Sequence, residues 1–396
     1  MKKILNKRMI ALLLAVMITV GTMAGCNNSD DSTNDTASDM SENTDEATKT
    51  DVIDPDAAAV SIDGNDIPAS ELFYILYNLQ SMYEMYGITD WSAVYEDKTY
   101  GDVLREEVEN SVLQINYLYS LAAEHGIELT DEDLEGISTD VSSFMDYIND
   151  GIVEKFGFTE ENVKEVLSKS VLGEQGYNAA VAKIVETQSK EVIEENKFRT
   201  IQHILISTAQ GTTETNESGE TVEAETVDEE TYKAEKRALA EEVLAKAKAG
   251  EDFAALAEEY NDDSSSEYSM NAAGVDETGT TFVTEFVEAA NALGEGEISD
   301  IVETEYGFHI IKCITTFNED VSMTAREAVA GNEVYTNYQA WLEEIEYEFK
   351  EIWTKYVITA LPADETTEET TAETTSEADS EADTTEKATA ETTQSE

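Results

Sequence analysis

Apolar side chains recur with a helical period through the first half of the chain. One stripe is spaced at i, i+4, i+7, i+11 and i+14, which places its members on a single face of a helix. That stripe consists of Leu72, Leu76, Leu79, Tyr83 and Tyr86. A second stripe runs from Leu104 to Ala122, and a long helix is expected over about 172–196. The pattern therefore predicts a helical N-terminal domain over 57–197, with a short alternating strand at 60–64.

The period changes from 3.6 to 2 at Arg199, where β-branched residues begin to alternate with polar ones. Strands are predicted at 200–207, 301–302 and 308–314, and helices at 233–248, 253–260 and 285–293. These elements predict a compact α+β unit over 198–317, in which helices pack on a small antiparallel sheet.

A last apolar stripe of helical period follows this unit. It consists of Tyr338, Trp341, Leu342, Ile345, Phe349, Ile352 and Tyr356. We expect a helix without strand partners over 318–361, packed back on the N-terminal helices. The fold class is then α+β, a mainly helical domain made from N- and C-terminal parts with the smaller unit inserted between them.

Charge narrows the range of partners. The 396 residues include 87 acidic and 24 basic ones, a net charge of −63. Such a chain repels phosphate, so nucleic acid is excluded as a partner. Acidic, Ser- and Thr-rich composition predicts a disordered tether at 26–56 and a disordered tail at 362–396.

The first 25 residues have the features of an export signal. Lys2, Lys3, Lys7 and Arg8 precede an apolar stretch from Met9 to Val20, which is too short for a clear membrane span. The segment Met23-Ala24-Gly25-Cys26 resembles the lipobox of bacterial lipoproteins, although methionine replaces the usual leucine. The resemblance implies a signal peptide at 1–25 and lipidation of Cys26. An ordinary secretory signal with a chance cysteine is the alternative.

Two of the three histidines lie inside short apolar strands about a hundred residues apart. One strand holds His203-Ile204-Leu205-Ile206, and the other lies within Tyr306-Gly307-Phe308-His309-Ile310-Ile311-Lys312. Between them stand four segments: Ala249-Gly250-Glu251-Asp252-Phe253-Ala254-Ala255-Leu256-Ala257-Glu258-Glu259-Tyr260, Asn261-Asp262-Asp263-Ser264-Ser265, Phe286-Val287-Glu288-Ala289-Ala290, and Gly296-Glu297-Ile298-Ser299. In this order and spacing the segments resemble the parvulin family of peptidyl-prolyl cis–trans isomerases. With the signal, the helical domain and the return helix, the chain further resembles exported foldase lipoproteins of the PrsA type and the SurA chaperones.

The resemblance implies a set of site residues. His203 and His309 match the paired histidines of the family, and Asp263 matches the acid or cysteine beside the rotating carbonyl. Thr304 matches a hydroxyl that supports the histidines. Phe282 and Phe286 match the apolar floor under the proline ring. No cofactor and no metal is needed for rotation about an amide, so we expect none.

One segment departs from the family. The usual Gly-Gly-Asp-Leu-Gly run, which shapes a wall of the proline site, is replaced by Met270-Asn271-Ala272-Ala273-Gly274-Val275-Asp276. Only Gly274 and Asp276 correspond to it. This departure puts substrate fit or rate in doubt.

Two functions remain open at the level of sequence. The first is a prolyl isomerase anchored through Cys26 at the outer face of the bacterial membrane, acting on unfolded exported polypeptides with X–Pro bonds. The alternative is an ATP-independent binding chaperone whose parvulin unit is weak or inactive. The loop 211–230 holds eight acidic residues and no basic one, so we expect no preference for phosphorylated substrates. The sequence leaves open whether the chain forms a homodimer.

Overall fold

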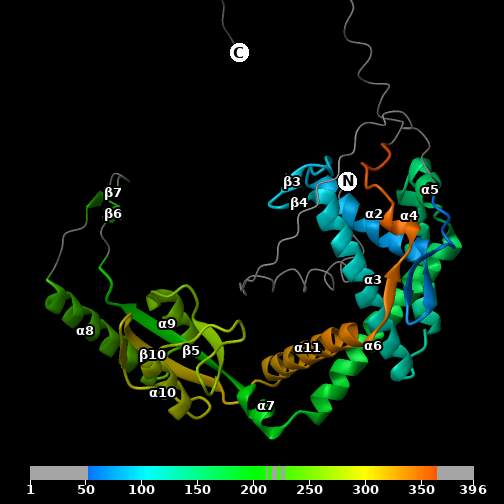
Figure 1. Ribbon diagram of the computed structural model, residues 1–396. Helices are drawn as coiled ribbons and strands as arrows, with labels where there is room; N and C mark the ends of the chain where they lie inside the picture. Colours follow the sequence, from blue (N-terminus) through cyan, green and yellow to red (C-terminus); the bar gives the residue numbers. More distant parts are fainter. Residues whose placement is uncertain (1–51, 211–212, 216–220, 224–227, 364–396) are drawn as a thin grey trace, which may run out of the picture. The chain divides into compact units, whose positions relative to one another are not determined.

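The computed structural model describes residues 52–210, 213–215, 221–223 and 228–363. The predicted signal peptide, Cys26, and nearly all of the two acidic tails lie outside these residues. The chain divides into two compact units (Figure 1). The first holds 52–113, 130–168 and 346–363, and the second holds 114–129 and 169–345. Among the described helices, none is long and apolar enough to cross a membrane.

The first unit is built from helices around a small antiparallel sheet. The sheet order is β11-β1-β2, and β3 and β4 form a separate hairpin. The strands are β1 (Ala58–Ile62), β2 (Asn65–Pro68), β3 (Val94–Tyr95), β4 (Lys98–Thr99) and β11 (Tyr347–Phe349). The helices are α2 (Ala69–Met85), α4 (Asp131–Tyr147), α5 (Asp150–Phe156) and α12 (Glu351–Thr354), with the first parts of α3 (Tyr100–Glu124) and α6 (Glu160–Thr187).

The segment after β11 is held in the core of this unit. The ring of Trp353 is fully buried and meets Phe73 edge-on at 5.8 Å between ring centroids. Arg105 lies over the Trp353 ring at 4.6 Å and donates hydrogen bonds to the carbonyls of Trp353 and Tyr356. These backbone partners satisfy the half-buried guanidinium, and the contacts fix residues 353–356 in place.

The second unit contains a four-stranded antiparallel sheet of order β8-β5-β10-β9. Its strands are β5 (Phe198–Ser207), β8 (Glu267–Asn271), β9 (Val302–Thr304) and β10 (Gly307–Thr315), and a hairpin of β6 (Thr213–Thr215) and β7 (Thr221–Glu223) lies in the loop after β5. Its helices are α7 (Lys190–Glu195), α8 (Glu229–Lys248), α9 (Phe253–Tyr260), α10 (Thr284–Ala292) and α11 (Glu319–Glu344).

Strand alternation sends side chains to two different layers. Ile204 and Ile206 of β5, with Phe308 and Ile310 of β10, pack against α8 and α9. Ile201 and Ile311 face the other way and pack against Phe286 of α10. His203 and His309 occupy the second set of alternating positions, so both histidines lie on the α10 side of the sheet.

The helix α11 closes the second unit. Ala330, Val334 and Tyr338 pack with buried residues from the later parts of α3 and α6. Gly176 of α6 lies so close to α3 that a Cβ atom there would come within 2.5 Å of the backbone nitrogen of Ala122. The predicted fold class, a mainly helical chain with an inserted α+β unit, is confirmed.

Several element boundaries differ from the prediction. The long helix expected to Asn196 stops at Thr187, because the Ser189 side chain accepts from Val192 N and caps a new helix, α7. The final helix ends at Glu344 rather than continuing through Tyr356. The expectation that it lacks strand partners is wrong, since Tyr347–Phe349 pairs with β1.

The start of the folded region also differs. Residue Ile53, assigned to the disordered tether, is buried, and its backbone nitrogen donates to Lys155 O at 3.2 Å. The Cγ and Cδ of Pro55 lie close to Gly157. The disordered tether predicted over 26–56 therefore extends too far into the folded unit.

Candidate active site

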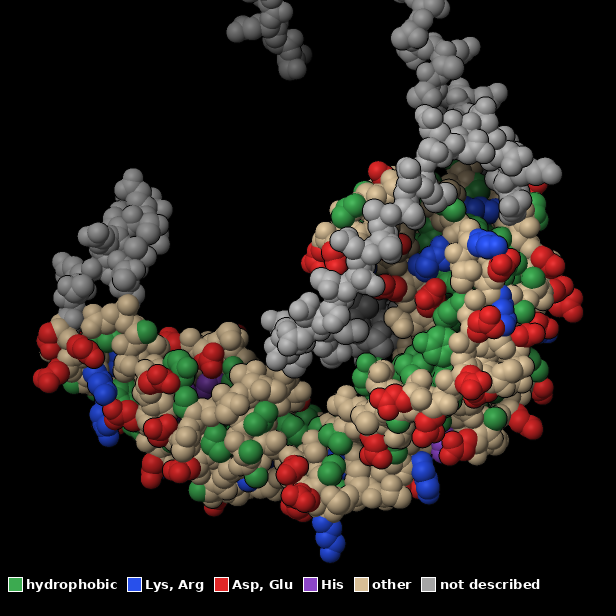
Figure 2. All heavy atoms as spheres, in the orientation of Figure 1, with side chains coloured by type: hydrophobic (Ala, Val, Ile, Leu, Met, Phe, Trp, Pro, Cys, Tyr) green, Lys and Arg blue, Asp and Glu red, His purple; other side chains and the backbone are tan. Residues whose placement is uncertain are grey.

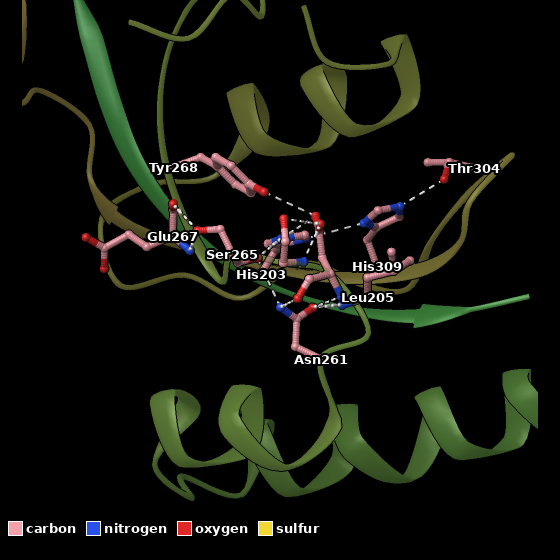
Figure 3. A network of polar contacts seen from close by, with 10 residues as sticks. His203, Leu205, Asn261, Ser265, Glu267, Tyr268, Thr304 and His309 are labelled. Carbon is pink, nitrogen blue, oxygen red and sulfur yellow. Dashed lines mark hydrogen bonds and ion pairs between the residues drawn. The ribbon is translucent and has the colours of Figure 1, made fainter. Parts of the chain in front are cut away.

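The two strand histidines meet on the central pair of strands. In the register of β5 and β10, His203 pairs with Ile311 and His309 pairs with Leu205, so the two rings are diagonal neighbours on one face. Both residues are buried, at 2% and 5% exposure. The rings stack at 5.7 Å with an 18° interplanar angle, and their Nδ1 atoms are 3.5 Å apart (Figure 3).

The partners of the rings fix which nitrogen carries each proton. His203 Nε2 is 3.0 Å from Ser265 O, and a carbonyl only accepts, so Nε2 holds the hydrogen and Nδ1 is an acceptor. His309 Nδ1 must then donate to His203 Nδ1, which leaves His309 Nε2 to accept from the Thr304 hydroxyl at 2.9 Å. Tyr306 N donates to Thr304 Oγ1 at 3.1 Å. The result is a series of hydrogen bonds that all donate in the same direction, from Thr304 to His309, His203 and the Ser265 carbonyl, with both imidazole rings neutral.

Burial favours the same neutral state. Burial lowers the pKa of His203, although the Ser265 carbonyl and the Asp263 carboxylate oppose the effect. Burial also lowers the pKa of His309 to about 4, helped by the neighbouring His203. Both imidazoles are therefore uncharged at neutral pH and act as fixed dipoles.

Asp263 comes to the histidines from the loop that follows α9. Its Oδ2 lies 3.3 Å from His203 Nε2, and its Oδ1 accepts from Ser264 N at 2.7 Å. About a third of the side chain is exposed, so the carboxylate can reach a bound molecule. Its backbone position is fixed by Asn261, whose Oδ1 accepts from Leu205 N at 2.8 Å and whose Nδ2 donates to the carbonyls of Asp263 and Ser265.

The floor of the site is aromatic. Phe286 of α10 is 1% exposed and meets the rings of His203 and His309 edge-on at 5.5 and 5.3 Å. Phe282 stacks on Phe286 at 5.3 Å and is only half-buried. Its backbone nitrogen donates to Gly274 O at 2.9 Å. Phe282 is thus the part of the floor that a ligand can touch.

The six predicted site residues are brought together in one place. Two further residues belong to the same cluster and were not singled out from sequence, namely Asn261, which anchors the loop, and Tyr268, whose hydroxyl is 3.3 Å from Asp263 Oδ2. The sequence signal for Tyr268 is an aromatic residue at an alternating strand position. For Asn261 the sequence carries no signal beyond its place in the Asn-Asp-Asp-Ser-Ser run. Among the described residues, no group of three His, Cys, Asp or Glu side chains is arranged to hold a metal ion.

The arrangement suits recognition of an apolar ring next to a polar amide. Phe282 presents a half-buried aromatic ring, and a carboxylate and two neutral imidazoles lie in the same cluster. The His203 ring donates to the Ser265 carbonyl, and the His309 ring accepts from the Thr304 hydroxyl, so both imidazoles are held by hydrogen bonds within the site. Its chemistry is binding and orientation in a poorly hydrated setting.

Comparisons with known proteins agree with this geometry. The family described as the PPIC-type PPIase domain, or rotamase, matches residues 203–315. The foldase protein PrsA of Caldanaerobacter subterraneus is 27% identical over 314 residues, which cover 77% of this chain and 82% of that protein. The PrsA of Halalkalibacterium halodurans is 32% identical over 235 residues, which cover 54% and 60%. The crystal structure of PrsA from Bacillus subtilis covers 65% of this chain and 92% of its own, at 19% identity and a TM-score of 0.25. Residues 203–315 therefore match the PPIC-type peptidyl-prolyl isomerase domain, and the chain is similar over most of its length to a PrsA foldase.

Proposed function

We propose that the isomerase activity of this foldase is carried by His203, Asp263, His309 and Thr304, with Phe282 and Phe286 holding the proline ring. The observation that carries the proposal is the one-directional hydrogen-bond chain that ends beside an apolar floor. Each ring nitrogen of His203 and His309 and the Thr304 hydroxyl has a hydrogen-bond partner, so these dipoles are oriented before substrate arrives.

The reaction requires no bond to break. A planar X–Pro amide is held by resonance with a barrier of about 18–20 kcal/mol, and that resonance places negative charge on the carbonyl oxygen. A carboxylate near this oxygen disfavours the planar form relative to the twisted one, where the charge is smaller. In this mechanism Asp263 supplies the negative charge. The two histidines are neutral and therefore add no positive charge beside it. The aromatic floor fixes the proline ring while the other side of the amide rotates.

We further propose that the chain works outside the cytoplasm, anchored through Cys26 at the outer face of the membrane, on unfolded exported polypeptides with X–Pro bonds. The support is the lipobox-like run before Cys26 and the similarity to PrsA foldases. Metabolic labelling with a radioactive fatty acid tests the anchor. Label should enter the wild type and be lost in Cys26→Ser, and equal labelling of both proteins would contradict it.

A binding chaperone is the second candidate, and the first unit offers an observation in its favour. Met85 and Tyr86 at the end of α2 are 76% exposed, and Val94 in the following hairpin is 69% exposed. Apolar side chains of this kind are adaptable contacts for unfolded chains.

Two refolding assays separate the candidates. One client refolds slowly because of a cis X–Pro bond, and the other aggregates but has no proline-limited phase. If the chain acts as an isomerase, it should accelerate the slow refolding phase of the first client. The Asp263→Ala variant should not accelerate it. Suppressed aggregation of the second client with no change in the first client's rate would favour the chaperone alone.

A further inference from the structure

Tyr268 is a half-buried member of the aromatic cluster at the site. It pairs with Ile201 across β8 and β5, so its side chain emerges on the same face as His203. Its ring centroid lies 5.3 Å from His203 and 5.2 Å from that of Phe282, in an edge-on arrangement with the latter. With Phe286 and His309 these rings form a closed circuit in which each neighbouring pair is 5.2–5.7 Å apart.

The hydroxyl of Tyr268 reaches the carboxylate of the site. It lies 3.3 Å from Asp263 Oδ2, and because an ionised carboxylate only accepts, Tyr268 is the donor. The same oxygen lies 3.3 Å from His203 Nε2. Burial and the charge of Asp263 both raise the pKa of Tyr268, which keeps the hydroxyl protonated. One carboxylate oxygen therefore accepts from Tyr268 of β8 and lies next to the imidazole of His203 on the adjacent strand β5.

The segment at 270–276 stands where the resemblance places the Gly-Gly-Asp-Leu-Gly run. After β8 it turns at Gly274, where φ is +78° and a Cβ atom would overlap the side chain of Val287. Asp276 accepts from the backbone nitrogens of Thr278 and Thr280 and holds the following loop. Phe282 follows directly after this loop. The family's leucine has no counterpart in it, and the aromatic side chain next to Phe282 comes instead from β8.

We propose that Tyr268 is a specificity-determining and positioning residue of the isomerase. Its ring forms the side wall of the proline pocket in place of the missing leucine, and its hydroxyl fixes the orientation of Asp263. This inference rests on the site assigned above. Tyr268 gives a chain without the Gly-Gly-Asp-Leu-Gly run an aromatic wall beside Phe282.

The test separates the ring from the hydroxyl. In the full chain, Tyr268→Phe removes only the hydroxyl and Tyr268→Ala removes both. The Tyr335→Phe variant on α11 is a matched control, since this half-exposed tyrosine lies outside residues 203–315. NMR line shapes of an Ala-Pro peptide give the Kd and the exchange rate on the enzyme separately.

The proposal predicts different changes in Kd and in exchange rate for the two Tyr268 variants. Tyr268→Phe should keep the Kd within twofold and lower the on-enzyme exchange rate about fivefold, as expected for loss of one long hydrogen bond to a charged group. Tyr268→Ala should in addition weaken peptide binding about tenfold through loss of an aromatic contact. The Tyr335→Phe control should match the wild type in both values.

The outcomes that refute the inference differ from those that refute the site. Wild type that accelerates exchange, with both Tyr268 variants within twofold of it in Kd and rate, overturns the role of Tyr268 alone. Wild type that does not accelerate exchange overturns the proposed function itself. If Tyr268→Ala fails to fold, the exchange rate and Kd of Tyr268→Phe still decide the role of the hydroxyl. A Tyr268→Leu variant that binds the peptide as the wild type does would show that the wall needs an apolar side chain of this size rather than an aromatic ring.

Discussion

Acidification should destabilise the isomerase domain through its paired histidines. Burial lowers the pKa of His309 from an ordinary value of 6.5 to about 4. Between these two values the unfolded chain binds a proton that the folded chain does not. Stability must then rise with pH across this window. The stabilising contribution is complete above about pH 6.5 and is lost as the pH falls to about 4.

The size of the effect follows from the same two values. At 1.36 kcal/mol for each pKa unit, the contribution is about 3 kcal/mol. It belongs to the pair, because His203 and His309 are in contact and titrate together. The net charge of −63 acts in the opposite direction, since protonation of carboxylates relieves repulsion. The wild type must therefore be compared with His309→Gln at each pH.

The assay has two parts. NMR titration of the histidine ring protons is simple because the chain has three histidines, and His125→Gln assigns the one outside the domain. Hydrogen exchange of β5 and β10 amides then reports domain stability, since none of the three tryptophans lies within 203–315. The stability advantage of wild type over His309→Gln should shrink by about 3 kcal/mol between pH 7 and pH 4. Two ring signals that both titrate near pH 6.5, with no change in that advantage, would refute the neutral hydrogen-bond chain.

Three further predictions concern the same domain. Thr304→Val keeps the side-chain shape but leaves His309 Nε2 without its hydrogen-bond donor. The free energy of unfolding, measured by thermal denaturation, should fall by about 1–3 kcal/mol, and an unchanged Tm would contradict the assigned tautomers. Gly274→Ala should cost more than Gly279→Ala in denaturant unfolding, because both glycines have positive φ but only the first has a side chain in the way. The expected costs are about 3 and about 1 kcal/mol, and equal costs would contradict the packing. Matched phospho-Ser-Pro and Ser-Pro peptides should not differ in favour of the phosphorylated one, because the loop after β5 is acidic, and faster exchange of the phosphopeptide would overturn that reasoning.

The sequence was sufficient for the parts of the site that lie on regular strands. Two short apolar runs predicted the strands that carry His203 and His309. Their spacing relative to the helices carried the family resemblance. Asp263 was identified only as a position in that resemblance, because its place beside His203 depends on a loop anchored by Asn261.

The missed features depend on contacts between distant segments. Tyr268 enters the site because β8 pairs with β5 about 65 residues earlier, and no local pattern reports such a pairing. The helical spacing of Ile345, Phe349 and Ile352 continues past the true helix end. Pairing of Phe349 with Val60 outweighs it, since a short amphipathic segment has little intrinsic helix stability.

The most direct test of the account is cis–trans exchange of an Ala-Pro peptide, measured by NMR with and without the full chain. We predict faster exchange in both directions with an unchanged cis fraction, and loss of the acceleration in both His203→Ala and Asp263→Ala while the remainder of the spectrum stays folded. Folded wild-type protein that leaves the exchange rate unchanged would contradict the claim that these residues form a prolyl isomerase site.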